Sequence, residues 1–396
     1  MRNLILGLCA AAFFAAPGAH AGGASTDPAT AVNAFAVDLY RRLAAPDENL
    51  FFSPASASVA LAMTRLGADG ATAAEMDRVL HFAPDDPLLA SAFGRFAGQL
   101  AVDPEFAVLR LANRLFGQSG LPFRRDYLAT LQEHFDAGLE QVDFRRDAEG
   151  ARRLINTWVE QQTEDRIKDL LADGDVGPST ALVLVNAVYF LGSWQQQFPM
   201  DATFDDTFHR ADGTEVTVPF MHLDGALRWG RAADAQVLAL PYKGNGLEMV
   251  LVLPDEGTTL ADLDRGLDAG RLASWLAAPM PRAVEAAVPR LHLETSFDLT
   301  RALADLGMTT AFGARADFSG MIDGGGLAID RVVHKAFLDV DEKGTEAAAA
   351  TGVVMRVTSA RPVDKVAFTA DRPFLLAIRH VDTGAVLFLG RVADPS

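Results

Sequence analysis

Cysteine is almost absent from this sequence. The 396 residues contain a single one, Cys9, inside an N-terminal stretch with the layout of a leader. A chain without further cysteines has no disulfide framework, no thiolate nucleophile and no cysteine metal site. The eight histidines are scattered singly, without the spacing of a metal site. These absences predict that the protein holds no metal.

The motifs of common enzyme classes are absent as well. The sequence has no G-x-S-x-G elbow, no H-E-x-x-H, no P-loop and no dinucleotide fingerprint. The segments DGDVG (173–177) and DGGG (323–326) lack the ligand ladder of a calcium loop and are typical of turns. His334 lies within an apolar run, which favours a hydrogen-bonded core residue over a general base. We therefore expect no enzymatic activity and no cofactor.

Lysine is scarce, and the overall charge is strongly negative. Five lysines stand against thirty arginines, and the net charge is −17. Such a charge argues against nucleic acid and anionic membranes as partners. The arginine-rich, alanine-rich composition is typical of a GC-rich bacterial genome and predicts a bacterial source. Because 49% of the residues are hydrophobic and no linker or repeat divides the chain, we expect one large domain and a monomer.

The N-terminal stretch MRNLILGLCAAAFFAAPGAHA (1–21) has three parts. Basic Arg2 precedes an apolar run that is too short to span a membrane, and the stretch ends in Ala19-His20-Ala21. This is the layout of a secretory signal peptide. It predicts a signal peptide over 1–21, a single domain over 22–396, and a secreted or periplasmic protein.

Helical patterns dominate the first half of the chain. Residues 30–44 place apolar side chains on one stripe. Ser53 is a good N-cap with Pro54 at the first helical position, and Thr72 with Glu75 has the spacing of a capping box. Further helices are predicted at roughly 87–101, 123–135 and 148–162.

Strand patterns dominate the second half. Residues 181–194, ALVLVNAVYFLGSW, form a long apolar run typical of a central strand buried on both faces. Turn signals at Asp212–Gly213, Gly244–Gly246 and Asp382–Gly384 predict three hairpins. Helices followed by hairpin-rich strands favour an α+β fold.

One stretch near the C-terminus, EKGTEAAAATGVV (342–354), carries no catalytic or ligand-binding side chain. Read with a period of two and continued to Val357, its odd positions from Thr345 are small or apolar, and the two charges, Glu346 and Arg356, fall on the other face. Small inward residues would let the segment enter between two existing strands. Because alanine is a poor strand former, a strand formed only part of the time is indicated. An Ala-rich surface loop or a short helix is the alternative interpretation.

Four motifs resemble the serpin family over essentially the whole chain from about residue 30 to 395. They are NLFFSPASAS (49–58), NAVYFLGSW (186–194), HKAFLDVDEKGTEAAAAT (334–351) and FTADRPFLLAIRH with LFLGRVADP (368–395). The resemblance implies a serpin fold with three β-sheets, eight or nine helices and an exposed reactive-centre loop at about 343–363. It also implies a metastable inhibitor of serine proteases that acts as a suicide substrate: a protease cleaves the loop, and the hinge strand inserts into the large sheet.

The resemblance also assigns site residues. The hinge comprises Gly344, Thr345, Glu346, Ala347, Ala348, Ala349, Ala350 and Thr351. The cluster beneath the opening sheet comprises Ser53, Ser56, Asn186 and His334. Trp194, Arg290 and Glu342 stand at the top of the sheet. A non-inhibitory serpin that acts as a binding or carrier protein is the alternative.

The cleaved bond is predicted by its distance from the hinge. Counting sixteen residues on from Glu342 gives Thr358–Ser359 as the cleaved bond. Arg356–Val357 is the alternative. Arg361–Pro362 is a third candidate, but the proline after the bond disfavours cleavage there. A small residue at the cleaved bond favours elastase-like or subtilisin-like proteases, while Arg356 leaves trypsin-like enzymes open. Heparin-activated serpins are basic in the region that corresponds to the residues before about 105. This chain is not basic there, so the resemblance implies no heparin activation.

Overall fold

The computed structural model describes residues 25–100, 105–136, 138–244, 246–345 and 364–396. Over these ranges the helices are α1 Pro28–Leu43, α2 Pro54–Arg65, α3 Gly70–Val79, α4 Leu89–Gln99, α5 Arg125–Phe135, α6 Ala148–Gln162, α7 Leu260–Arg265, α8 Ala269–Ala277 and α9 Leu299–Asp305, with short 3₁₀ turns η1 Met200–Ala202 and η2 Thr310–Phe312. The strands are β1 Leu50–Phe52, β2 Ala107–Gln118, β3 Leu139–Val142, β4 Leu182–Ser193, β5 Thr203–His209, β6 Glu215–Ala232, β7 Ala235–Pro241, β8 Leu247–Pro254, β9 Met280–Pro289, β10 Leu291–Asp298, β11 Arg331–Val340, β12 Gly344–Thr345, β13 Val366–Thr369, β14 Phe374–His380 and β15 Val386–Val392.

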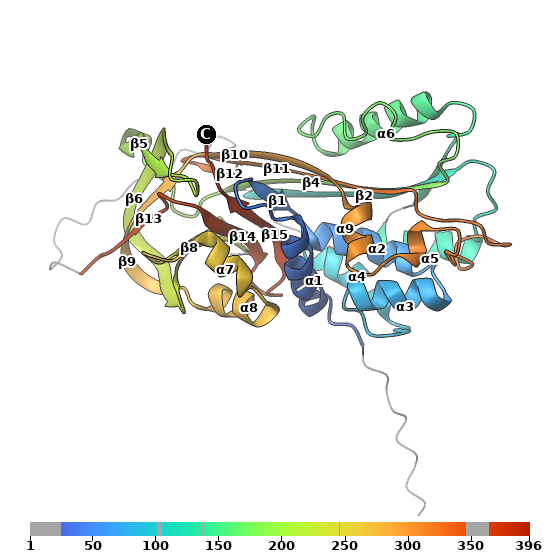
Figure 1. Ribbon diagram of the computed structural model, residues 1–396, viewed down its shortest axis with the longest axis horizontal. Coiled ribbons are helices and arrows are strands. Elements are labelled where there is room, and N and C mark those ends of the chain that lie inside the picture. The colour runs from blue at the N-terminus through green and yellow to red at the C-terminus, as the bar shows by residue number, and fades with distance from the viewer. Residues whose placement is uncertain (1–24, 101–104, 137, 245, 346–363) are drawn as a thin grey trace, which may run out of the picture.

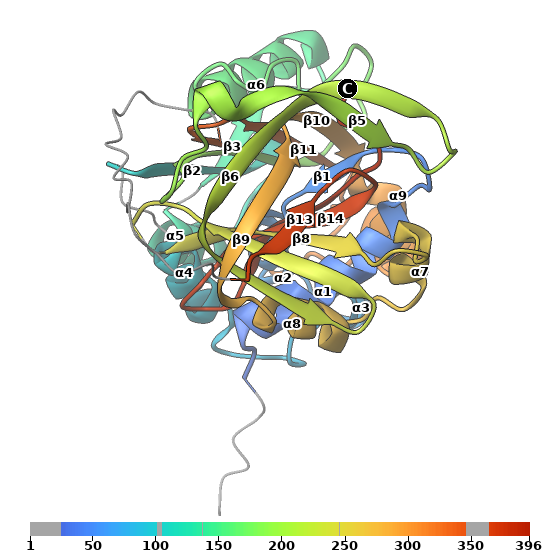
Figure 2. The same cartoon turned by 90° about the vertical axis from the view of Figure 1, so that its left-hand side faces the viewer.

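The strands form two hydrogen-bonded networks. The smaller is a six-stranded sheet in the order β10-β11-β12-β4-β2-β3. The larger has nine strands in the order β1-β15-β14-β8-β7-β6-β9-β13, with β5 added on β6. The long strand β6 joins two parts of this network, because its first half pairs with β5 and its end pairs with β7; Figure 2 shows β6 beside β9. Counted as two sheets, these parts give the three sheets predicted, and the predicted α+β fold is confirmed.

The six-stranded sheet is covered on both faces. Helix α6 lies on one side of it, and α1 to α5 lie with α9 on the other (Figure 1). Along the central strand β4, alternate residues enter two different cores: Leu184 and Val188 face the main core, whereas Val183 and Val185 face the core under α6. This double burial explains why the sequence of β4 is a continuous apolar run.

Most local sequence signals are confirmed. The Ser53 hydroxyl accepts a hydrogen bond from the backbone N–H of Ser56 and caps α2, with Pro54 in the first turn. The three hairpins form as predicted, joining β5 to β6, β7 to β8 and β14 to β15. The helical patterns predicted at 87–101, 123–135 and 148–162 correspond to α4, α5 and α6.

The predicted capping box at Thr72 and Glu75 is wrong. Helix α3 begins at Gly70 and its N-cap is Asp69, three residues before the predicted N-cap Thr72. The Thr72 hydroxyl instead accepts from the N–H of Asp317, at 2.9 Å. The Glu75 carboxylate accepts from the N–H of Thr310, at 2.7 Å. Both side chains bind segments more than two hundred residues away, which a local pattern does not reveal.

Across the described ranges, no helix is both long and apolar enough to cross a membrane.

Candidate functional site

The six-stranded sheet contains one boundary with two kinds of pairing. Strands β4 and β11 are parallel and pair directly over seven residue pairs, from Val183↔Arg331 to Tyr189↔Phe337. Beyond these pairs the strands separate and β12 lies between them, antiparallel to both. We call the boundary between β4 and β11 the insertion lane; its open end appears in Figure 1, where β12 lies between the ends of β11 and β4.

Thr345, the last described residue before the hinge alanines, already lies in this lane. It pairs with Gly192 of β4 and with Val340 of β11, and it is fully buried. Its hydroxyl lies 2.7 Å from the Tyr242 hydroxyl, so each satisfies the other. The first predicted hinge residues therefore occupy a strand position in the uncleaved protein.

Glycine is required at the position before Thr345. A Cβ added to Gly344 would lie 2.0 Å from the carbonyl oxygen of Gly192 and 2.8 Å from the Cα of Ser193. Both contacts are with backbone, which cannot rotate away. Backbone approaches this close accommodate only glycine, so Gly344 lets β12 enter the lane.

Trp194 directly follows β4 and contacts the turn at the open end of the insertion lane. Its ring stacks on Tyr242, with centroids 4.5 Å apart and an interplanar angle of 17°. Its indole N–H donates to the carbonyl of Asp341, at 2.9 Å, and its backbone N–H donates to the carbonyl of Lys343, also at 2.9 Å. Trp194 thus holds the turn that leads into β12.

The same turn is fixed by Asp341 and Glu342. One carboxylate oxygen of Asp341 accepts from the N–H groups of Lys343 and Gly344, at 2.8 and 3.1 Å. Glu342, although 1% exposed, accepts from the Arg290 guanidinium and from the Thr203 hydroxyl, the latter at 2.6 Å. Burial opposes the charged form, but these hydrogen bonds outweigh it and hold the pKa of Glu342 below its usual value. Arg290 and Glu342, which the resemblance places as a base and an acid at the top of the sheet, form an ion pair.

The four residues predicted beneath the sheet lie in one hydrogen-bonded group. The His334 ring nitrogen Nε2 accepts from the N–H of Ser53, at 3.0 Å, and its Nδ1–H donates to the side-chain oxygen of Asn186. The Asn186 amide donates to the Ser56 hydroxyl, at 2.6 Å. His334 on β11 and Asn186 on β4 are direct partners across the insertion lane. We call Ser53, Ser56, Asn186 and His334, with Asn113, the polar cluster.

The sequence patterns did not predict that Asn113 belongs to the polar cluster. It lies on β2 directly opposite Asn186, and its side-chain oxygen accepts from both Asn186 and the Ser56 hydroxyl. The available signal was a lone amide in the apolar run LANRLF, but the strand itself was not predicted. Only the register of β2 against β4 brings Asn113 to the cluster.

His334 is neutral in this setting. Burial lowers the pKa of His334 to about 3, because no carboxylate is present in the cluster to offset the loss of solvation. With Nε2 accepting and Nδ1 donating, a neutral ring satisfies both of its neighbours. The cluster therefore places polar groups in the lane without placing a charge there.

Several predicted site residues lie outside the described residues. They are the signal peptide (1–21), the hinge residues Glu346, Ala347, Ala348, Ala349, Ala350 and Thr351, and the candidate reactive bonds Thr358–Ser359 and Arg356–Val357. The roles of all the site residues stay predictions.

Comparison with known proteins points to one family. The model of the family described as serpin (serine protease inhibitor) matches residues 30–395. The leukocyte elastase inhibitor of Bos taurus is 42% identical over 91% of this chain and 97% of its own length. Serpin B6 of Macaca fascicularis is 40% identical over 93% of this chain and 99% of its own length. An uncharacterised serpin-like protein of Thermococcus kodakarensis is 41% identical over 92% of this chain and 85% of its own length.

Solved structures agree with the family model and confirm the predicted serpin fold. Uncleaved ovalbumin superposes with a TM-score of 0.85 at 30% identity, covering 93% of this chain and 100% of ovalbumin. Human thyroxine-binding globulin in complex with thyroxine gives a TM-score of 0.83 at 30% identity, covering 93% of this chain and 99% of the globulin.

These relatives correct two expectations. The leukocyte elastase inhibitor and serpin B6 are matched over nearly their whole length by a region that leaves out part of this chain, and the family model begins only at residue 30. They point away from secretion, so the predicted secreted or periplasmic destination is wrong. The bacterial source predicted from composition is not supported either, because the leukocyte elastase inhibitor and serpin B6 relatives named above are mammalian.

The contact between Tyr242 and Thr345 predicts a measurable coupling. Tyr242→Phe and Thr345→Val each leave one buried hydroxyl without its partner, whereas the double variant removes both hydroxyls. A double-mutant cycle on the free energy of unfolding should give a coupling of about 1 kcal/mol. Additive effects in urea denaturation would show that the two hydroxyls do not stabilise the docked hinge.

The neutral state of His334 predicts a pH dependence. The unfolded chain takes up a proton on this ring below about pH 6.5, while the folded protein does so only near pH 3. Its contribution to stability is therefore present above pH 6.5 and is lost as the pH falls toward 3, by up to about 1.4 kcal/mol per pH unit. His334→Asn should remove this part of the slope. Urea midpoints between pH 7 and pH 4 that run parallel for both proteins would contradict it.

Proposed function

Because the chain belongs to the serpin family, we propose that it inhibits serine proteases by trapping them as suicide substrates. The observation that carries this proposal is the position of β12, which lies between β4 and β11 before any cleavage. The protein acts as the substrate of another enzyme and is itself no catalyst. A protease serine attacks the loop between Thr345 and Asp364, and its hydroxyl forms an ester with the loop carbonyl while the peptide bond breaks. The acylated segment is then free to extend β12.

The register of β12 specifies where each inserted residue would arrive. Continued antiparallel pairing moves one residue back along β4 and β11 for each residue forward along the hinge. Ala347 would then lie between Phe190 and Leu338, and Val353 between Leu184 and Val332. All four neighbours line the main core, as does the Thr345 contact Tyr242. The inward positions of the hinge are small or apolar, which suits this core.

Backbone hydrogen bonding favours insertion. Entry of the segment breaks the seven direct pairs between β4 and β11 and replaces them with pairing on both sides of the new strand. Each net hydrogen bond contributes about 0.5–1.5 kcal/mol. Burial of Val353 and Met355 would contribute about 1.5–3 kcal/mol each if complete. The sum is on the order of 10 kcal/mol, comparable with the whole stability of an ordinary domain.

The polar cluster stands in the path of the inserting strand. Six residues beyond Thr345, the register brings Thr351 between Asn186 and His334. Their mutual hydrogen bond must open to admit it. The Thr351 hydroxyl both donates and accepts, so it would offer each of them a new partner. The neutral ring of His334 keeps the cost of this exchange low, because no charge is uncovered.

For the target, we propose cleavage after Thr358 by elastase-like or subtilisin-like proteases, with trypsin-like cleavage after Arg356 as the alternative. The small Thr358 side chain suits a shallow primary pocket, and several relatives are leukocyte elastase inhibitors. A cut after Arg356 would leave a tether two residues shorter, and insertion would strain the protease less. We propose no heparin requirement and a monomeric inhibitor.

A carrier function is the second candidate. Thyroxine-binding globulin, a fold neighbour at a TM-score of 0.83, was solved with thyroxine bound. An inhibitor forms covalent, SDS-resistant complexes with proteases, whereas a carrier is cleaved or left intact. Incubation with an elastase, a subtilisin and trypsin separates the two functions.

A carboxylate introduced at position 347 tests the insertion register. Ala347→Glu would bury an unpaired charge against Phe190 and Leu338, at a cost of several kcal/mol. Insertion should then be slower than deacylation, and the variant should be cleaved as a substrate without covalent complex. Glu346→Ala, the control on the opposite face of the inserted strand, should keep the stoichiometry of inhibition unchanged. If Ala347→Glu traps the protease as well as the wild type does, the proposed register is wrong.

A change of the cleaved residue tests the target. Thr358→Arg should shift inhibition toward trypsin, because arginine pairs with the acidic primary pocket of trypsin-like enzymes. Mass spectrometry of the released peptide should place the wild-type cut after Thr358. Loss of all inhibition in Arg356→Ala, with inhibition retained in Thr358→Asp, would move the reactive bond to Arg356–Val357.

A further inference from the structure

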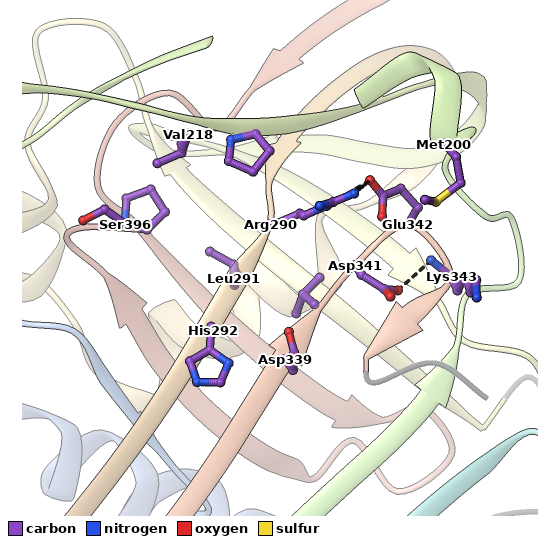
Figure 3. Close-up of a pocket in the computed structure, with 13 residues that line it drawn as sticks. Met200, Val218, Arg290, Leu291, His292, Asp339, Asp341, Glu342, Lys343 and Ser396 are labelled. Atoms are coloured by element: carbon purple, nitrogen blue, oxygen red, sulfur yellow. Dashed lines mark hydrogen bonds and ion pairs between the residues drawn. The ribbon is translucent and has the colours of Figure 1, made fainter. Parts of the chain in front are cut away.

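A cavity of about 510 Å³ lies beside the turn that leads into β12. Its size falls within the range of small-molecule sites. The turn itself supplies one wall, through Asp341, Glu342 and Lys343, and the beginning of β10 supplies another. Figure 3 shows the Arg290 side chain extending toward Glu342, with Val218 and Ser396 on one side and Leu291 and Asp339 on the other. None of these residues belongs to the proposed reactive-centre loop beyond Thr345.

The lining combines apolar and charged side chains. Val218, Leu291 and Val340 are each at most 5% exposed and form its inner surface. Met200, 61% exposed, lies at its edge. Such a surface suits an aliphatic or aromatic body, which would lose its own contact with water on entry.

Arg290 supplies a hydrogen-bond donor that no described residue uses. Its Nε and Nη2 both donate to one oxygen of Glu342, and its Nη1 has no hydrogen-bond acceptor among the described residues. The Arg290 side chain is 43% exposed and lines the cavity. A carboxylate could accept from Nη1 without displacing Glu342. Charge-assisted hydrogen bonds of this kind are the strong ones.

The acidic residues restrict the ligand to one charge. Asp339 lines the cavity, and Glu342 already occupies the other nitrogens of the guanidinium. Together with Asp341, three side-chain carboxylates line the cavity against two cations, Arg290 and Lys343, so a second anionic group would add to an excess of negative charge. From this arrangement we propose that the cavity binds amphipathic monocarboxylates, with the carboxylate on Arg290 and the apolar body against Val218, Leu291 and Val340.

The proposed site can be tested separately from the proposed protease inhibition, because the test measures ligand binding directly and uses no protease. Isothermal titration of the full chain with octanoate should show saturable binding, and octylammonium, with the same body and the opposite charge, should not bind measurably. Arg290→Gln should weaken octanoate about tenfold or more. Because that variant also loses its pairing with Glu342, a second pair of variants leaves the ion pair intact.

Met200 provides that pair. Met200→Glu should weaken octanoate about threefold or more by charge repulsion, and Met200→Lys should strengthen it by a similar factor. Met280→Glu is the matched control, since Met280 is also 61% exposed and begins the strand that ends next to Arg290, about 30 Å away. It should leave the affinity unchanged. Absence of octanoate binding, equal binding of octylammonium, or equal weakening by Met200→Glu and Met280→Glu would each overturn the proposal.

Discussion

Strands β4 and β11 satisfy their facing backbone groups in two ways within one sheet: directly with each other over seven pairs, and through β12 where they separate. Buried backbone donors and acceptors must be paired, so a boundary of this kind has only these two solutions. Pairing through β12 can replace the direct pairing of β4 with β11 without a change of fold, because only a longer β12 is needed. The buried Thr345, the glycine at 344 and the stacked pair of Trp194 and Tyr242 all act at the point where one solution gives way to the other.

The charged groups along this boundary are compatible both with direct pairing of β4 and β11 and with pairing through β12. The ion pair of Arg290 and Glu342 lies at the end of the lane, where Arg290 is still 43% exposed and the turn does not have to move. Inside the lane, the polar cluster contains amides, hydroxyls and a neutral imidazole. Neutral groups can exchange hydrogen-bond partners at modest cost, whereas a buried charge that loses its partner costs several kcal/mol.

Family membership and local detail answer different questions here. The relatives establish the fold and overturn the destination inferred from the leader. The register of β12 against β4 and β11 is what relates particular hinge residues to particular neighbours. The cavity beside Arg290 arises from the same turn, but its chemistry depends on residues from η1, β6 and β10 that no single motif contains.

The sequence by itself determined those features whose causes lie within a few residues. Ser53 and Pro54 start α2, the glycine-containing turns close three hairpins, and the apolar run of β4 marks a strand buried on both faces. Resemblance of motifs added the identity of four members of the polar cluster. Tertiary structure alone decided the partners: Ser53 reaches His334 across 281 residues, Asn113 joins through the register of β2, and Thr72 and Glu75 bind distant backbone instead of capping α3. A short-range pattern fixes backbone dihedrals and faces, whereas hydrogen-bond partners far apart in the chain are chosen only when the strands and helices pack.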